Sequence, residues 1–166
     1  CLHDGVYRYE SDKTETSNTS DSFNAKMACQ QLSSSSSEGL ELALYTKIGM
    51  GDGQQANNPW LQEFPDPITR NAWDNYATVS KKDADKLGIE NRVTSNGAMD
   101  GDMIHVKVGN QTIKNVPIFV QPGQVPGSIG IALGYGRKEG LQDEMQVGFN
   151  AYPLYQNFKL DQSVSI

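Results

Sequence analysis

The sequence predicts a mostly β fold with short helices, and its patterning indicates this in three ways. First, its apolar runs, such as residues 40–49 and 129–136, have the length of strands. Second, clusters of glycine, proline and asparagine separate these runs, as they do at turns between strands. Third, strand and helix patterns do not alternate along the chain. A barrel of about six or seven short strands is therefore favoured over a parallel α/β sheet.

Residues 1–39 are interpreted as an N-terminal segment and a Ser-rich linker that precede the barrel. Ser, Thr, Asn and Asp dominate them, and the serine run at 33–37 buries too little apolar surface to offset the loss of conformational entropy on ordering. A strand-like patch at 6–9 and a short ordered patch around 23–32 interrupt this composition. Because Cys1 rather than Met opens the chain, we expect a piece cut from a longer protein.

The first elements of the barrel follow from local signals. Residues 40–49 are apolar nearly throughout, which is typical of a strand buried on both faces. Residues 75–80 predict a second short strand. The serine that ends this strand is suited to cap a two-turn helix at 81–87, since Asp83 stands three residues later and Gly88 suits the position after the helix.

The later elements centre on a hairpin. Residues 103–108 and 113–121 predict its two strands, with a tight turn at 109–112. Pro117 in the return strand indicates an edge position or a bulge, because proline cannot donate a ladder hydrogen bond. A further strand is predicted at 128–136, before a polar surface segment.

Charge, hydropathy and cysteine content restrict the function. The net charge is −6 and the pI is near 4.8, so the surface repels phosphate backbones and nucleic acid is not expected as a partner. No apolar run approaches the roughly 20 residues that a membrane-spanning helix needs. The two cysteines, Cys1 and Cys29, are too few for a structural zinc site or an iron–sulfur cluster, and whether they form a disulfide stays open.

No motif in the chain predicts a catalytic residue or a metal site. His105 alternates with apolar neighbours in a predicted strand, so we interpret it as a strand-face side chain rather than a ligand or base. Asp66 and Asp74 flank an aromatic stretch, and one interpretation makes them a carboxylate pair. Roles in turns and caps beside Pro67 and Asn75 are favoured instead.

The aromatic–proline segment, residues 57–80, has the most unusual composition. It holds two Trp, one Phe, one Tyr and three Pro with little helical or strand period. Its aromatic side chains are Trp60, Phe64, Trp73 and Tyr76. Either they pin the loop to the barrel, which we favour, or the loop caps a cofactor or partner domain and exposes Asn57, Asn58 and Gln62 as hydrogen-bonding groups.

Several phrases together resemble a known family. They are "NNPWLQEFPDP", "WDNY", "PGQVPG", "LGYGR" and "NAYPL", with a strand-to-helix step at 79–89. In combination they look like the C-terminal domain of molybdopterin oxidoreductases. They are similar to one branch, the large iron–sulfur subunit of the bacterial alternative complex III. The resemblance covers roughly residues 40–154. It implies a double-psi β-barrel, assigned here to 40–158, followed by a tail at 159–166.

In that branch the molybdopterin-like part carries no molybdenum cofactor. The resemblance therefore implies a non-catalytic structural barrel, with no cofactor of its own, in a subunit of a membrane-associated respiratory quinol oxidoreductase. It also implies iron–sulfur clusters elsewhere in the parent subunit and a place on the periplasmic face of the bacterial cytoplasmic membrane. The implied partners are other domains of the parent subunit, a membrane quinol-binding subunit and c-type cytochrome subunits.

The alternative is the pterin-dinucleotide-binding domain of an active molybdoenzyme related to polysulfide or thiosulfate reductases. The contacts to molybdopterin would then fall on Asn57, Asn58, Arg137 and Asn150. Catalytic relatives often have Thr-Gly-Arg after the first strand, whereas this chain has "TKIG" at 46–49, a departure that favours the cofactor-free barrel. A third interpretation is a free-standing β-barrel binding module. The linker and the start of the chain at Cys1 rather than Met argue against it, because an independent secreted module should carry its own N-terminal signal.

We expect the aromatic–proline segment to cover the mouth of the barrel and the space that a pterin occupies in catalytic relatives. An open, solvent-filled groove lined by Asn58, Arg137 and Asn150 would contradict this expectation.

Overall fold

The computed structural model describes residues 24–33, 39–156, 159 and 161–166, which fall in two separate units. In the first unit, Cys1–Ser36, the described residues form one element, the helix α1 (Ala25–Ser33). The predicted patch at 6–9, the serine run beyond this helix and Cys1 lie outside the described residues.

Helix α1 falls where the sequence predicts a short ordered patch. The side chain of Asn24 accepts a hydrogen bond of 3.0 Å from the backbone N–H of Met27. This bond satisfies one of the N–H groups that the first turn of a helix leaves without a partner.

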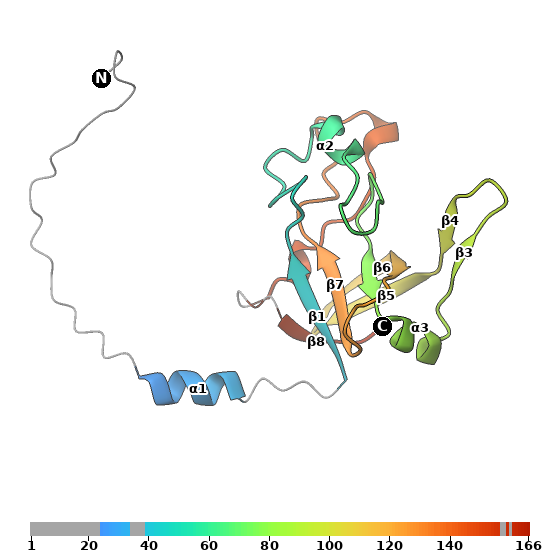
Figure 1. The fold of residues 1–166 in the computed structure, drawn as a ribbon. Helices are drawn as coiled ribbons and strands as arrows, with labels where there is room; N and C mark the ends of the chain where they lie inside the picture. Colours follow the sequence, from blue (N-terminus) through green and yellow to red (C-terminus); the bar gives the residue numbers. More distant parts are fainter. Residues whose placement is uncertain (1–23, 34–38, 157–158, 160) are drawn as a thin grey trace, which may run out of the picture. The chain divides into compact units, whose positions relative to one another are not determined.

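The second unit, Ser37–Ile166, is built around a six-stranded mixed sheet with the strand order β5-β6-β2-β7-β1-β8 (Figure 1). The strands are β1 (Leu40–Tyr45), β2 (Ala77–Val79), β5 (Met103–Val108), β6 (Gln111–Val120), β7 (Ser128–Ala132) and β8 (Asp161–Val164). Strands β1 and β7 are parallel, and so are β2 and β6, whereas the other neighbouring pairs are antiparallel. A separate two-stranded hairpin consists of β3 (Asn91–Val93) and β4 (Met99–Gly101).

The sheet curls until its two edge strands meet. Lys107 of β5 and Ser165, which follows β8, exchange two backbone hydrogen bonds of 2.9 and 3.1 Å. The resulting half-barrel is accompanied by the helices α2 (Pro59–Glu63) and α3 (Lys81–Leu87) and by the 3-10 turns η1 (Asp143–Met145) and η2 (Tyr152–Leu154). The prediction of a mostly β fold with short helices is confirmed.

Strand β1 has only one face in the core. Leu42 and Leu44 are buried, whereas Glu41 and Tyr45 are exposed. The prediction of a strand buried on both faces is therefore wrong for β1. Its second face carries Ala43 and Tyr45, and these side chains line a surface cavity rather than packing under another element.

Two local predictions are confirmed closely. Helix α3 has the predicted bounds, with Ser80 Oγ accepting a 3.1 Å hydrogen bond from the Asp83 N–H and Gly88 at φ +70° after the last turn. Strands β5 and β6 form the predicted hairpin, in which Val108 pairs with Gln111 across a two-residue turn. Local capping and turn chemistry were sufficient for both elements.

Pro117 is not on an edge strand, because β6 lies between β5 and β2; it pairs with Met103, and a bulge lies just before it in β6. The pairing of β5 with β6 shifts register between Ile104 and Val106. Asn115, two residues before the proline, has φ +57°. Proline is tolerated in this interior strand because the ladder is already interrupted beside it.

The C-terminal residues 159–166, which the sequence assigns to a tail after the barrel, contribute a strand. Strand β8 pairs antiparallel with β1, and Leu40 lies opposite Val164. The segment is polar, yet an edge strand needs only part of one face to be apolar, and Val164 is buried. No helix in the part of the chain that the structure describes has the length and apolar character that a membrane span requires.

Candidate site at the ends of β1 and β7

Strands β1 and β7 are parallel, so the chain leaves both at the same edge of the sheet. Lys47 follows β1, and its side chain is almost fully buried. Its Nζ lies 3.5 Å from Asp66 Oδ2, 4.1 Å from the centre of the Tyr76 ring and 5.6 Å from that of Tyr135. The buried ammonium group thus has both a carboxylate and aromatic faces as partners.

The carboxylate of Asp66 joins this ion pair to the aromatic–proline segment. Its Oδ1 accepts hydrogen bonds of 2.9 Å from the backbone N–H groups of Ile68 and Thr69. Burial raises the pKa of Asp66, but these hydrogen bonds and the charge of Lys47 together outweigh burial and hold the pKa below its usual value. The predicted turn role is confirmed, and the ion pair is a second role that the sequence did not indicate.

Two tyrosines beside the ion pair are neutral phenols. Partial burial, assisted by the nearby Tyr76 and Asp66, raises the pKa of Tyr135 to about 12 and also raises that of Tyr45, which is 37% exposed. The hydroxyl of Tyr76 is hydrogen-bonded to Thr69 Oγ1. The charges of Lys47 and Asp66 therefore neutralise each other in surroundings that are aromatic and uncharged.

Asn75 connects the aromatic–proline segment to two other loops at this edge. It is fully buried, and its Nδ2 donates hydrogen bonds to the carbonyl oxygens of Ala132, at 3.1 Å, and Phe149, at 3.0 Å. Its Oδ1 accepts a hydrogen bond of 2.9 Å from the Phe149 N–H. One buried amide thus has partners for both its donor and its acceptor, as buried polar groups require.

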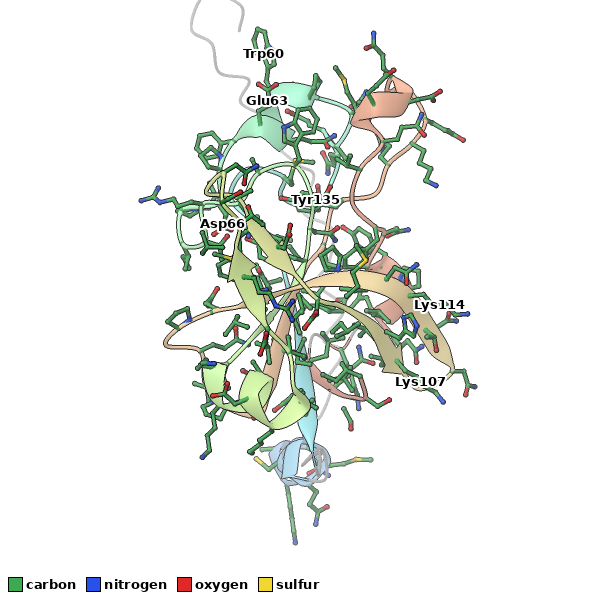
Figure 2. All side chains as sticks on the ribbon, turned by 90° about the vertical axis from the view of Figure 1, so that its right-hand side faces the viewer. Trp60, Glu63, Asp66, Lys107, Lys114 and Tyr135 are labelled. Carbon is green, nitrogen blue, oxygen red and sulfur yellow. The ribbon has the colours of Figure 1, made fainter. Side chains whose placement is uncertain are left out.

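The four aromatic side chains of the aromatic–proline segment do not act alike. Tyr76 is buried and Trp73 is half-buried, but Trp60 and Phe64 are 81% and 59% exposed. Figure 2 shows Trp60 projecting outward from α2. The expectation that the aromatic side chains pin this loop to the sheet is wrong for Trp60 and Phe64.

The reason lies in helix α2 itself. Asn58 is its N-cap, and the Asn58 Oδ1 accepts a 3.1 Å hydrogen bond from the Trp60 N–H. Gln62, which the sequence suggested as an exposed group, is buried, and its Nε2 donates to the Ala56 carbonyl at 2.9 Å. Its own carbonyl accepts a 2.7 Å hydrogen bond from the Trp73 N–H. Helix α2 therefore directs Gln62 inward, whereas Trp60 and the C-cap residue Phe64 face outward.

Two of the four residues that the resemblance assigns to a pterin site come together. Arg137 and Asn150 line one cavity of about 210 Å³, with Tyr152 beside them. Asn57 is exposed outside the lining of this cavity, and the Asn58 side chain is the cap of α2. The cavity is smaller than the roughly 300–1,000 Å³ of most ligand pockets. Asn58 does not line this cavity with Arg137 and Asn150.

The loops after β1 and β7 touch at this cavity. A Cβ on Gly134 would lie 2.8 Å from the Gly51 carbonyl oxygen and 2.9 Å from the Gly53 nitrogen, and the φ of Gly134 is +90°. The Tyr152 hydroxyl donates a hydrogen bond to the carbonyl of Asp52 in the same loop. The chain's own backbone therefore fills space beside Arg137 and Asn150.

A neighbouring hollow of about 660 Å³ lies within the loop 136–140 and shares Gly136 and Arg137 with that cavity. Arg137, Lys138 and the oppositely charged Glu139 are exposed there. This is a place where an anion could reach positive side chains, although a single loop forms its lining.

The other candidate residues have structural roles. His105 is exposed on β5, and its Nδ1 accepts a 3.2 Å hydrogen bond from the Asn115 N–H at the bulge. Asp66 and Asp74 line different cavities rather than forming a pair. Among the residues whose positions are described, no group of three or more His, Cys, Asp or Glu side chains could hold a metal ion.

No protein-family model matches this chain, and neither does any curated protein. Sequence reasoning missed the roles of Lys47, Gln62 and Asn75. A signal existed for Lys47 and Asn75, because each is a polar residue next to an apolar strand segment. Gln62 carried no such signal, since only the direction of a short helix places it inside.

Proposed function

We propose that this chain is a non-catalytic structural barrel of a larger respiratory oxidoreductase subunit. The proposal rests on the resemblance to molybdopterin oxidoreductases, in the branch of the alternative complex III, and takes the half-barrel as a double-psi β-barrel. The parent complex oxidises quinol at the periplasmic face of the bacterial cytoplasmic membrane, with its iron–sulfur clusters in another region of the parent subunit. Its partners are other domains of that subunit, a membrane quinol-binding subunit and c-type cytochrome subunits.

The sheet supports the barrel part of the proposal. Its parallel pairs, β1 with β7 and β2 with β6, join strands that are distant in sequence, as crossover connections require. Its edges approach closure where Lys107 meets Ser165. A sheet that closes on itself leaves few unpaired edges, which suits a domain that packs among others.

The observation that carries the proposal is the ion pair of Lys47 with Asp66. Lys47 stands where catalytic relatives often have a Thr-Gly-Arg phrase, and a cation there would suit a pyrophosphate. In this chain the cation is buried, and the carboxylate of the chain's own aromatic–proline segment neutralises it. An anionic cofactor would have to displace Asp66 and leave its charge without a partner, which is costly in a buried position.

An exposed apolar patch supports the role in assembly. It consists of Trp60 and Phe64 at helix α2, which are 81% and 59% exposed. Two more exposed apolar side chains, Ile48 and Ile68, belong to the segments before and after α2 and are 87% and 74% exposed. Phe64 lies beside the residue that follows Ile48, since a Cβ on Gly49 would be 3.5 Å from the Phe64 ring. Large exposed apolar groups of this kind, with a tryptophan among them, are typical of protein interfaces.

Replacement of the patch in the full-length parent subunit tests the role in assembly. We expect Trp60→Ser/Phe64→Ser to reduce the fraction of parent subunit that co-purifies with the membrane and cytochrome subunits. The matched control is Val93→Ser/Val125→Ser, which removes two other exposed apolar side chains. Equal recovery of both variants would exclude the patch as the assembly surface.

A second candidate function, pterin-dinucleotide binding in an active molybdoenzyme, is favoured by the hollow at 136–140 and its exposed Arg137. In that case Asn150 would lie near the pyrophosphate together with Arg137, and Asn58 would not, because it caps α2. Arg137→Ala in the parent would then lower the pterin content of the purified protein, whereas a structural barrel has none to lose.

A further inference from the structure

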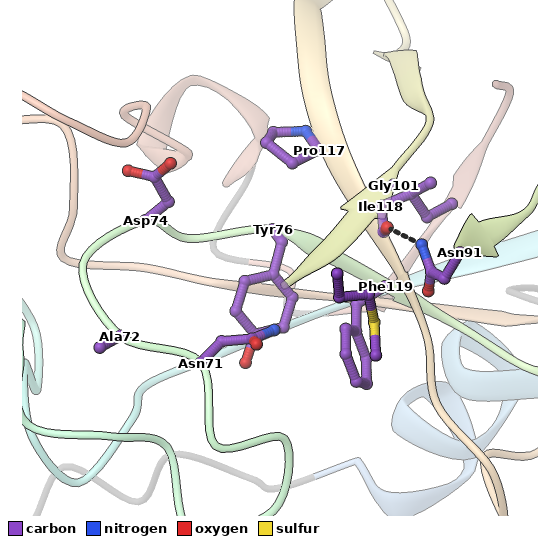
Figure 3. A pocket seen from close by; sticks show the side chains of 10 residues that line it. Asn71, Ala72, Asp74, Tyr76, Asn91, Gly101, Pro117, Ile118 and Phe119 are labelled. Carbon is purple, nitrogen blue, oxygen red and sulfur yellow. Dashed lines mark hydrogen bonds between the residues drawn. The ribbon is translucent and has the colours of Figure 1, made fainter. Parts of the chain in front are cut away.

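A second cavity shares Tyr76 with the site just described and is otherwise lined by different residues. It measures about 250 Å³ and lies between the loop that carries Asp74, the β3–β4 hairpin and β6. In Figure 3, Asp74 and Pro117 lie at one end of it and Asn71 and Phe119 at the other. The volume suits a single side chain or a small organic molecule rather than a nucleotide.

The wall of this cavity is preformed. Asn91 of β3 donates a 3.0 Å hydrogen bond to the Ile118 carbonyl and accepts a 2.6 Å hydrogen bond from the Val120 N–H, which ties the hairpin to β6 (Figure 3). A Cβ on Gly101 would lie 2.7 Å from both the Asn91 amide nitrogen and the Ile118 carbonyl oxygen. The hairpin is therefore held close to β6, and the cavity needs no rearrangement to form.

Aromatic rings supply part of the lining. The rings of Tyr76 and Phe119 have centroids 5.7 Å apart and are inclined at 51°. Both residues line the cavity, with Pro117 and Met99 as apolar neighbours. Aromatic faces attract organic cations, because their π-electrons present negative charge.

Asp74 supplies a carboxylate that has no cation. Its side chain accepts a hydrogen bond from the backbone of Gly148, and no lysine or arginine in the described part of the chain forms an ion pair with it. Asp74 is exposed, yet partial burial of its carboxylate raises its pKa despite that hydrogen bond. Lys47, the cation over the Tyr76 ring, is already paired with Asp66. A cation at that end of the cavity would therefore find an unneutralised carboxylate, with the aromatic rings further along the cavity.

We propose that this cavity binds the charged end of an organic cation, an alkylammonium or guanidinium group. The carboxylate of Asp74 pairs with the charge, and the rings of Tyr76 and Phe119 contact the alkyl stem. The side-chain amide of Asn71 has no partner among the described residues and is a hydrogen-bonding group for the far end of the ligand. The net charge of −6 favours the approach of cations. The cation comes from a lysine or arginine of a partner protein or from a free amine. This inference does not depend on the proposed function.

Titration of the full 166-residue chain, followed by its two-dimensional amide NMR spectrum, tests the proposal. The probes are N-acetyl-lysine methylamide, n-butylammonium and the uncharged N-acetyl-norleucine methylamide. We expect both cations to shift the amide signals of Asn71, Tyr76 and Phe119, with weak affinity because the carboxylate is partly exposed. We expect the uncharged analogue to bind about fivefold more weakly or not at all.

Three variants accompany the titration. Asp74→Asn keeps the shape of the side chain, and we expect it to weaken cation binding about fivefold. Phe119→Leu removes the ring that contacts the alkyl stem but keeps a smaller apolar side chain, and we expect a loss of about two- to fivefold. Asp100→Asn removes an exposed carboxylate of the same hairpin that does not line the cavity, and we expect little change.

The outcomes are distinct. Equal binding of the charged and uncharged probes, or equal weakening by Asp74→Asn and Asp100→Asn, would overturn the proposal. If both cations bind through Asp74, the lysine derivative and n-butylammonium distinguish the source. Tighter binding of the lysine derivative indicates a partner side chain, and tighter binding of n-butylammonium indicates a free amine.

Discussion

Lys47 Nζ lies 3.5 Å from Asp66 Oδ2, and the two side chains are only 7% and 11% exposed. This ion pair joins the residue after β1 to the aromatic–proline segment across 19 positions of sequence. A buried pair contributes little over a well-packed apolar pair, but the loss of one partner leaves a buried charge without compensation. The pair therefore specifies where the segment lies more than it adds to the free energy of unfolding.

The first prediction concerns this ion pair. Asp66→Asn keeps the shape and the acceptor for the turn but removes the charge, so we expect the free energy of unfolding to fall by about 2–4 kcal/mol. The matched control is Asp85→Asn, which removes the partner of Lys81 in an exposed pair and should change stability by less than about 0.5 kcal/mol. Urea unfolding measures both. Equal losses in the free energy of unfolding would show that the buried charge of Lys47 does not need Asp66 to compensate it.

The second prediction is the pH dependence of the stability difference between the wild-type chain and Asp66→Asn. The pKa of Asp66 is lowered in the folded chain, so its contribution to stability is present above the ordinary value of 3.8 and is lost as pH falls through the folded pKa. We expect the stability gap between the wild-type chain and Asp66→Asn to be constant near neutral pH and to narrow below pH 3.8. Urea unfolding at a series of pH values measures the gap. A gap that widens on acidification would contradict the assignment.

The third prediction concerns Asn75. Asn75→Ala removes three hydrogen bonds and leaves the N–H of Phe149 and the carbonyl of Ala132 without this partner, so we expect a loss of about 2–4 kcal/mol. Asn71→Ala is the control, because the Asn71 side-chain amide has no partner among the described residues. Thermal and urea unfolding compare them. A stability of Asn75→Ala close to that of Asn71→Ala would rule out the connecting role of this amide.

The fourth prediction concerns the contact of the loops after β1 and β7. A Cβ on Gly134 meets backbone atoms at 2.8 and 2.9 Å, so Gly134→Ala should cost more than about 2 kcal/mol through displacement of the loop. Gly97 also has a positive φ, but a Cβ there meets open space, so Gly97→Ala should cost about 1 kcal/mol. Urea unfolding of the two variants gives the comparison. Similar losses of stability in Gly134→Ala and Gly97→Ala would mean that the close contact between the loops after β1 and β7 is not required.

The parts of the fold that local chemistry determines were predictable. Ser80 and Gly88 bound α3 because a cap and a left-handed residue act within one turn of a helix. The β5–β6 hairpin likewise follows from its two-residue turn. Strand β8 was not predictable as part of the sheet, because pairing with β1 depends on contacts across most of the chain.

The candidate site was predictable only in part, because side-chain direction is a tertiary property. Arg137 and Asn150 do line one cavity, but Asn58 caps α2, and Asn57 lies outside the lining of that cavity, near Gly140. Trp60 faces outward although it is a large aromatic side chain, and Gln62 takes the inward position. Nothing in the pattern of residues 57–80 distinguishes these two directions.

The deciding measurement is the metal and pterin content of the proposed parent subunit, purified at full length. Elemental analysis gives molybdenum, tungsten and iron, and fluorescence after oxidation gives pterin. We expect iron without molybdenum, tungsten or pterin, because the charge of Lys47 is already neutralised by Asp66 and the cavity at Arg137 and Asn150 is small. Stoichiometric molybdenum or tungsten with pterin would contradict the structural role and make Arg137 and Asn150 working cofactor contacts.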